Sequence, residues 1–183
     1  MLNSYETDRL ILKTLKKDDA AMVLSFYEDN RSHFEPWEPM RNINFYSLSY
    51  QKASLNAEFN LMLEGKLIRY WIFLKNNPNE IVGCLCFQNF LREPYQSCCL
   101  GYKLSHNHLH HGYATEALEK GISVLFREHH LHRIEAFIMP DNEPSSHLLQ
   151  RLGFLYEGVS HSYARVQGIW ADHGRYAFIN PVE

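Results

Sequence analysis

Residues 109–115, with the sequence LHHGYAT, lead from a polar stretch into a helical pattern. The first amide groups of a helix have no partner inside it, and the helix dipole favours an anion at that end. Gly112 lets the main chain approach a ligand closely and adopt a positive φ. Backbone amides here could therefore hold a phosphate or pyrophosphate group. Taken alone, however, the pattern indicates a structural turn more strongly than a ligand site.

Histidines and cysteines are the residues of this chain that could hold a metal. Residues 106–111 form an H-x-H-x-H-H run, but no acidic or cysteine partner lies within it, so an exposed polar loop explains it better. The cysteines stand as Cys84-x-Cys86 and Cys98-Cys99, and neither spacing is C-x-x-C. Small core residues in a reducing compartment explain them better than a zinc site between paired strands. We expect no metal.

Length, charge and hydropathy bound the class of protein. The chain has 183 residues, of which 45% are hydrophobic and 21% charged, as expected for one folded domain over residues 1–183. A net charge of −3 lacks the basic surplus of a nucleic-acid binder, so a basic partner fits better. The apolar runs are too short to span a membrane, and residues 1–8 contain no leader pattern. We expect a cytoplasmic protein.

The first half of the chain supplies a strand and two helices. Residues 9–13 have the pattern of a strand, and Asp18 or Asp19 can cap a helix that continues to Tyr27. Residues 30–44 contain Pro36 and Pro39, which predict an irregular loop anchored by an aromatic side chain. A second helix is expected over residues 47–64, ending at a glycine.

The second half predicts most of a sheet. Residues 67–75, 81–88 and 97–104 have the pattern of an antiparallel meander, followed by a helix over residues 112–129. A strand over residues 133–139 and a short helix precede two final strands, which turn at Gln167-Gly168. The sequence therefore predicts an α/β fold with a mixed, mostly antiparallel sheet of about seven strands flanked by helices.

Residues 100–117 resemble the coenzyme-A loop of the GNAT acetyltransferases. The family motif has six residues, with Gln or Arg first, Gly fourth and Gly or Ala sixth. Gly112 and Ala114 match it, whereas Leu109 replaces the polar first residue and His110 stands where relatives often have glycine. In this family the phosphate ligands are mainly backbone amides, which any residue except proline supplies.

A second GNAT element follows in the expected order, as HRIEA at residues 132–136, MPDN at 139–142 and LQRLGF at 149–154. The match narrows to the RimJ/RimL branch, the ribosomal-protein-alanine N-acetyltransferases, and is strongest to its RimJ-type members. The segments that carry it are ETDRL at residues 6–10, PWEP at 36–39, EG at 157–158 and GIWADH at 168–173. The resemblance implies the GNAT fold, a sheet opened between its fourth and fifth strands, and acetyl-CoA as co-substrate. It implies the N-terminal alanine α-amine of a small-subunit ribosomal protein as acceptor.

The resemblance also assigns the cofactor site. Main-chain groups of Tyr102, Lys103 and Leu104 would pair with the pantetheine arm like an added strand. The pyrophosphate would be held by Leu109, His110, His111, Gly112, Tyr113, Ala114 and Thr115. Asn142 would line the far arm of the cofactor, and Ser145 would lie near its sulfur. Asn142 and Ser145 could equally cap the next helix, and both roles can hold together.

The implied reaction is direct transfer from acetyl-CoA to the amine in a ternary complex, and positioning can supply most of its rate. Many GNAT enzymes use a tyrosine seven positions after the motif asparagine as the acid, but this chain has Leu149 there. Ser145 is the substitute candidate. Glu38 is the candidate general base because it lies beside Trp37, near the expected peptide groove. Trp37 is either a wall of that groove or a core plug, and for Glu116 a first-turn acid that complements the helix dipole is favoured.

Two other functions stay open. One is acetylation of a small-molecule amine, since the same fold serves such enzymes. The other is a non-catalytic module that retains coenzyme A and acts in ribosome assembly or regulation, which the departures at Leu109 and Leu149 keep open. The expected partner is an acceptor protein N-terminus, with no direct nucleic-acid or membrane contact, and the expected state is a monomer or a weak homodimer.

Overall fold

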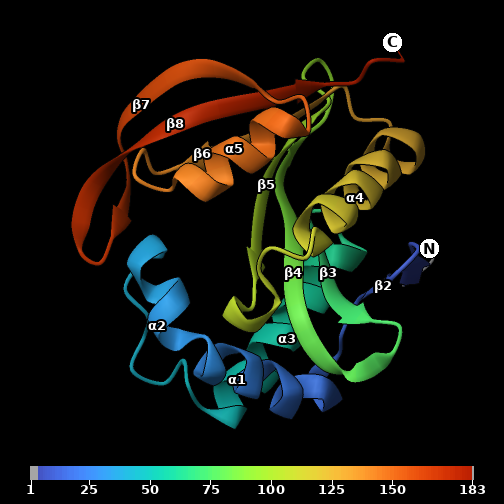
Figure 1. Ribbon diagram of the computed structural model, residues 1–183, viewed down its shortest axis with the longest axis vertical. Coiled ribbons are helices and arrows are strands. Elements are labelled where there is room, and N and C mark those ends of the chain that lie inside the picture. The colour runs from blue at the N-terminus through green and yellow to red at the C-terminus, as the bar shows by residue number, and fades with distance from the viewer. Residues whose placement is uncertain (1–3, 183) are drawn as a thin grey trace.

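The computed structural model describes residues 4–182, and one eight-stranded sheet runs through them (Figure 1). The strand order is β1-β2-β3-β4-β5-β6-β8-β7. The strands are β1 Ser4–Glu6, β2 Leu10–Lys13, β3 Leu67–Leu74, β4 Asn77–Leu91, β5 Ser97–Leu104, β6 Arg133–Ile138, β7 Leu155–Val166 and β8 Ile169–Ile179. Every neighbouring pair is antiparallel except β5 and β6, so the predicted mixed, mostly antiparallel sheet is confirmed. The strand beyond the expected seven is β1, a short edge strand paired with β2.

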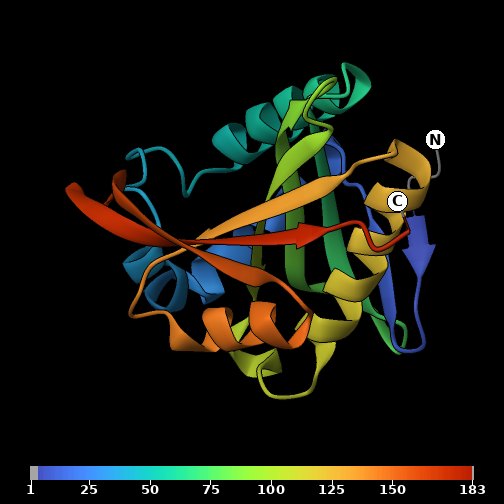
Figure 2. The same ribbon diagram turned by 90° about the horizontal axis from the view of Figure 1, so that it is seen from above.

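Helices cover both faces of this sheet, as Figures 1 and 2 show. They are α1 Ala20–Asp29, α2 Arg31–Phe34, α3 Leu48–Leu63, α4 Tyr113–His129 and α5 Glu143–Arg151. The core lies in two parts. The larger contains Leu118 and Leu125 of α4 and Leu149 of α5, and the other contains Phe26 of α1 and Leu55 of α3. None of the helices among residues 4–182 is long and apolar enough to cross a membrane.

The expectation of an irregular loop over residues 30–44 is wrong for its first half. Residues 31–34 form α2, and a 3₁₀ helix, η2 Glu35–Trp37, continues from it. Pro36 lies in the first turn of η2, where a missing amide proton costs nothing because that amide has no partner in the helix. The prolines therefore limit the helical segment at Trp37 and do not prevent it.

The sheet opens between β5 and β6. Their parallel pairing joins only Ser97, Cys98 and Cys99 to residues 133–135, after which the two strands diverge. On its other side β5 stays paired with β4 as far as Leu104. The main chain of β5 beyond Cys99 therefore has no strand partner on the β6 side, which confirms the predicted opening between the fourth and fifth strands of the expected sheet.

Helix α4 begins beside this opening. A β-carbon on Gly121, in the middle of α4, would lie 2.8 Å from the Leu85 side chain of β4, so only glycine permits this close approach. The apolar side chains of α4 face the larger part of the core. Close packing of α4 on β4 fixes the N-terminus of the helix next to the end of β5.

Candidate active site

The loop before α4 has the geometry of an anion site. Gly112, the N-cap residue, has φ = 78°, and no side chain caps the helix. His110 also has a positive φ, of 63°. The first amide groups of α4 are thus left without a capping partner from a side chain, at the end of the helix where an anion is favoured. This arrangement fits the predicted pyrophosphate loop.

An arginine from the turn between β1 and β2 holds this loop in place. The Arg9 guanidinium donates to the His111 carbonyl oxygen at 2.9 Å and to the Glu116 carboxylate at 2.7 Å. The Thr7 hydroxyl donates to the same carboxylate at 2.5 Å. Burial opposes ionisation of Glu116, but these hydrogen bonds and the Arg9 charge outweigh it and lower the pKa of the carboxyl group. Glu116 therefore serves the structure of the loop.

We expect Glu116→Gln to destabilise the protein by about 1–2 kcal/mol at pH 7, because charge-assisted hydrogen bonds to Thr7 and Arg9 are lost and half-exposed Arg9 limits the effect. A carboxyl group whose pKa is lowered by folding stabilises the protein above its ordinary pKa of about 4.3 and loses this contribution as the pH falls through the lowered value. Urea unfolding of the wild type and of Glu116→Gln measures the loss in stability at pH 7 and at pH 3. A variant that costs as much at pH 3 as at pH 7 would contradict the assignment.

On the α5 side of the opening, Tyr102, Asn142 and Ser145 come together. The Tyr102 hydroxyl of β5 donates to the Ser145 carbonyl oxygen at 3.1 Å. Burial raises the pKa of Tyr102 to about 12, so the phenol stays neutral and can donate. The Asn142 side chain accepts from the Ser145 amide at 3.3 Å and caps α5. The capping role considered for Asn142 is thus present, and a hydrogen bond from the Ser145 side chain partly offsets the effect of burial on the pKa of Tyr102.

Glu38 and Lys103 meet on the opposite face of the sheet. Side chains alternate along a strand, so Lys103 points away from Tyr102 and lies over the Tyr27 ring at 5.4 Å. The Glu38 carboxylate forms ion pairs with both Lys103 and Arg41. Both oxygens of the Glu38 carboxylate are therefore engaged by cations. Burial lowers the pKa of Lys103 to about 8.

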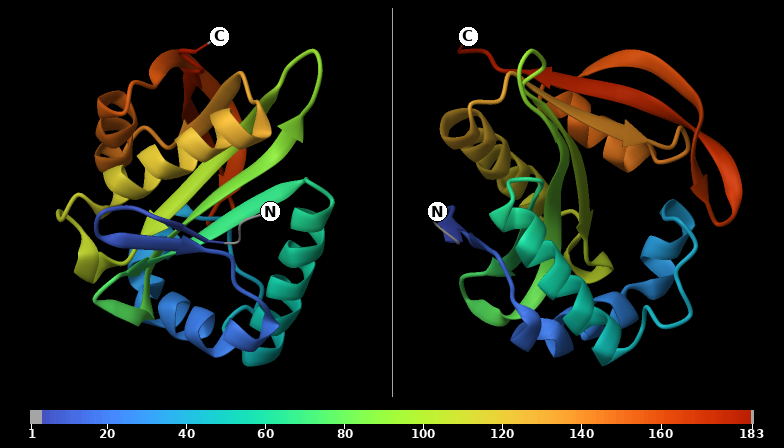
Figure 3. Two further views of the ribbon diagram at one scale, coloured as in Figure 1. Left: turned by 90° about the vertical axis from the view of Figure 1, so that its right-hand side faces the viewer. Right: turned by 180° about the vertical axis from the view of Figure 1, so that it is seen from behind.

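The β7–β8 hairpin closes over the segment that carries Glu38. The side-chain amide of Gln167, in the predicted turn, donates to the carbonyl oxygens of Glu35 and Glu38 at 2.8 and 3.1 Å. The hairpin tip and the α2 region lie side by side in Figure 3. Trp37 is 38% exposed, so it is not a core plug. We define the acceptor face as the sheet face that carries Lys103 and the side of the hairpin that faces it.

Sequence reasoning missed several side chains on this acceptor face. Phe137 of β6 stacks on Tyr163 of β7 at 4.2 Å, and Tyr163 contacts His173 of β8 at 5.2 Å. No local pattern points to them, because a bulge shifts the register of β7 between Ser160 and Ala164. Only the assembled hairpin brings these rings together.

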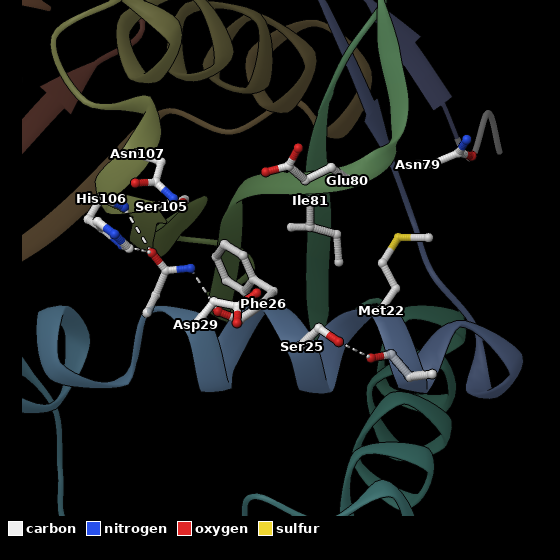
Figure 4. Close-up of a pocket in the computed structure, with 12 residues that line it drawn as sticks. Met22, Ser25, Phe26, Asp29, Asn79, Glu80, Ile81, Ser105, His106 and Asn107 are labelled. Carbon is white, nitrogen blue, oxygen red and sulfur yellow. Dashed lines mark hydrogen bonds between the residues drawn. The ribbon is translucent and has the colours of Figure 1, made fainter.

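A cavity of about 580 Å³ lies outside both of these regions, between α1 and the start of β4 (Figure 4). Polar side chains dominate its lining, with Asp29 and Glu80 on two sides and His106 at one end. None of the residues predicted to bind the cofactor or acceptor lines it. His106 instead bonds to Asn30, the residue that ends α1, through Nδ1 at 2.9 Å. Within the described residues, no three His, Cys, Asp or Glu side chains form a group that could hold a metal.

A sheet opened beside an uncapped, glycine-led helix N-terminus is the architecture of an acyl-CoA N-acyltransferase. Residues 9–155 match the family described as Acetyltransferase (GNAT) domain, so the chain belongs to the GNAT acetyltransferases. It is an acetyl-CoA-dependent N-acetyltransferase with the predicted GNAT fold.

Particular relatives narrow the comparison. The chain is 34% identical over 175 residues, covering 96% of this chain and 90% of the relative, to the [ribosomal protein uS5]-alanine N-acetyltransferase of Escherichia coli (strain K12). The crystal structure of ribosomal-protein-S5-alanine acetyltransferase from Vibrio fischeri has a TM-score of 0.91 at 30% identity, with 97% of each chain covered. Mycobacterium smegmatis RimJ in complex with CoA-disulfide has a TM-score of 0.87 at 29% identity, covering 93% of this chain and 81% of that chain. The predicted RimJ-type resemblance is confirmed.

Proposed function

We propose that this enzyme acetylates the N-terminal α-amine of a ribosomal protein, with alanine as the first residue and a small-subunit protein as the acceptor. The observation that carries the proposal is the 34% identity to the uS5-alanine enzyme across 96% of the chain. A basic ribosomal-protein tail also suits a chain with a net charge of −3.

We assign the acetyl-CoA site to the opening between β5 and β6. The main chain of Tyr102, Lys103 and Leu104 holds the pantetheine arm, because the pairing of β5 with β6 stops at Cys99. Residues 109–115 hold the pyrophosphate with backbone amides at the start of α4. Asn142 lines the far arm while it caps α5.

The reaction needs little from side chains before attack. An α-amine has a pKa of about 7.7–8.0, so a useful fraction is neutral near pH 7. Its lone pair attacks the thioester carbonyl carbon, a C–N bond forms, the C–S bond breaks and the ammonium proton is released. We assign Ser145 as the acid that protonates the departing thiolate and regains its proton from solvent, because it lies beside Tyr102 at the opening and its backbone is held by Tyr102 and Asn142.

We expect Ser145→Ala to lower kcat about 10- to 100-fold, with little change in the KM for the peptide, because the lost hydroxyl acts on the leaving thiolate. The variant keeps both backbone hydrogen bonds of residue 145. Ser146→Ala is the matched control, since the Ser146 hydroxyl bonds to the Asn142 carbonyl oxygen within α5. Steady-state kinetics decide, and an unchanged kcat for Ser145→Ala removes this residue from the mechanism.

On the acceptor side, we assign Trp37 and Glu38 to the wall of the peptide groove. Glu38 carries negative charge between Lys103 and Arg41, and partly exposed Trp37 offers an aromatic surface. The arriving ammonium group of the acceptor is attracted to this carboxylate. Glu38 is also the general base predicted from the sequence, and each of its carboxylate oxygens forms an ion pair.

Intact-mass analysis tests the proposed function. The enzyme and acetyl-CoA are incubated with peptides that begin with alanine, with the same peptides blocked at the α-amine, and with polyamines and free amino acids. One added acetyl group, confined to peptides with a free α-amine, is the expected result. Modification of small amines alone would indicate a metabolite enzyme, and coenzyme-A binding without acetylation of any amine would indicate a non-catalytic module.

A further inference from the structure

His173 lies on β8 at the point where its neighbour β6 has ended. Gly174 pairs with Ile138, the last residue of β6, so His173 is one residue past the paired segment. Its side chain lies on the same face as Arg175 two residues later, whereas Tyr176 faces the larger part of the core. Arg175 pairs with Phe137, and Arg175 bonds to Glu135 at 2.5 Å. His173 is thus on the acceptor face, at the edge of the opening in the sheet.

The hydrogen bonding of the imidazole defines its tautomer. Nδ1 lies 3.1 Å from the Ala171 carbonyl oxygen. A carbonyl oxygen only accepts hydrogen bonds, so Nδ1 carries the proton and Nε2 of the neutral ring keeps its lone pair. Nε2 has no hydrogen-bond partner among residues 4–182. A single ring nitrogen is therefore ready to accept a proton.

Surrounding groups hold this ring in place. His173 is 7% exposed and is one of only five buried polar residues within residues 4–182. The Tyr163 ring lies 5.2 Å away and is itself stacked on Phe137. The bulge that sets Tyr163 in this position has Ser162 at φ = 47°, and bulges often occur next to active sites.

Asp172, the residue before His173, anchors the bulge that carries Tyr163. Asp172 accepts from the Ser162 amide and from His161, both at 2.7 Å. The hydrogen bonds from Ser162 and His161 lower the pKa of Asp172, and its carboxylate holds the bulge residues next to Tyr163 in place. Glu38, by contrast, already binds two cations. Both carboxylate oxygens of Glu38 are engaged by cations, whereas Nε2 of His173 has no hydrogen-bond partner among residues 4–182.

The geometry points to His173 as the general base of the acetyl transfer, with Nε2 taking the proton that the acceptor amine loses. This inference rests on the proposed acetyl transfer to an amine. The amine N–H bond breaks as its nitrogen bonds to the acetyl carbon, the electron pair of that N–H bond stays on nitrogen, and the proton moves to Nε2. The imidazolium then releases the proton to water. Arg175 and Glu135 on the same face pair with each other and with neighbouring charges, so neither competes for it.

The test compares His173→Gln, which keeps a polar side chain without a basic nitrogen, with the wild type. We expect kcat to fall about 100-fold, the acetyl-CoA Kd to stay within about twofold, and activity of His173→Ala to be partly restored by added imidazole. The decline of wild-type kcat/KM at acid pH should flatten in His173→Gln. The control is His130→Asn at the C-cap of α4, an exposed histidine outside the site, and it should keep wild-type kinetics.

Three results would overturn the assignment. They are an unchanged kcat and pH profile in His173→Gln, a Glu38→Gln variant that alone loses the acid limb, and a wild type that acetylates no amine. Nitrogen NMR of the wild type provides a further test that requires no variant. A neutral His173 ring that carries its proton on Nε2 would exclude Nε2 as the proton acceptor. The kinetics use whichever amine the wild type acetylates, so a small-molecule acceptor would refute the ribosomal substrate and leave the test of His173 intact.

Discussion

Gly112→Asp weakens acetyl-CoA binding about 100-fold, as the expected result of placing a side chain and a negative charge in a backbone anion site. Gly112 has φ = 78° and caps α4, and a β-carbon there would lie 3.4 Å from Arg9 Nη2. Aspartate tolerates a left-handed conformation better than most residues, so the fold should survive. The aspartate carboxylate would then lie at the same backbone amides as the cofactor phosphates and repel them. Calorimetric titration with coenzyme A measures the change.

Gly65→Asp is the matched control for backbone strain. Gly65 follows α3, has φ = 68°, and a β-carbon there would lie 3.9 Å from the guanidinium of Arg92. Both substitutions thus place aspartate at a left-handed position beside an arginine, and both should cost about 1 kcal/mol in stability. Only Gly112→Asp should change the affinity for coenzyme A. Equal affinities in the two variants would show that the phosphates bind elsewhere.

The second large effect concerns Leu149, which stands where many GNAT enzymes carry their tyrosine acid. Leu149 has no exposed surface and belongs to the larger part of the core. We expect Leu149→Ala to lower the free energy of unfolding by about 2–5 kcal/mol, because lost burial and the remaining cavity both count. Urea unfolding followed by circular dichroism measures this. The position stabilises α5, and with it the backbone of Ser145.

Leu155→Ala provides the comparison. Leu155 is 68% exposed at the start of β7, so its truncation should lower the free energy of unfolding by less than about 0.5 kcal/mol. Leu149→Met, which nearly conserves volume, should cost less than about 1.5 kcal/mol. If Leu149→Ala costs no more than Leu155→Ala, then residue 149 is not part of the core and a direct role at the cofactor must be reconsidered.

Much of the fold follows from local patterns in this chain. The bounds predicted for the strands at residues 97–104 and 169–179 are those of β5 and β8, and the predicted turn at Gln167-Gly168 joins β7 to β8. Alternation, turn residues and helix caps act within a few positions, so a single sequence is enough to recognise them. Residues 30–44 were misjudged because proline in the first turn of a short helix resembles proline in a loop.

The backbone geometry of the proposed cofactor site could also be predicted, since it is made by consecutive residues. A backbone anion site needs Gly112 and the helix that follows it, and both are local. The parallel contact of β5 with β6 ends after three residues because the strands diverge, and a motif in the right order was enough to expect that opening. Residue identities at positions 109 and 110 matter less because amides are supplied by the main chain.

Only the tertiary structure decided which distant side chains meet. Glu38 pairs with Lys103, which is 65 positions away, and Tyr102 bonds to Ser145, which is 43 positions away. His173 meets Phe137 only through Tyr163, after a bulge has changed the register of β7. The sequence by itself determined the family, the sheet and the glycine-led start of α4, because these depend on short-range patterns. Two details depend on side chains that meet only when the sheet and hairpin assemble. They are which carboxylate forms ion pairs and which imidazole nitrogen lacks a hydrogen bond.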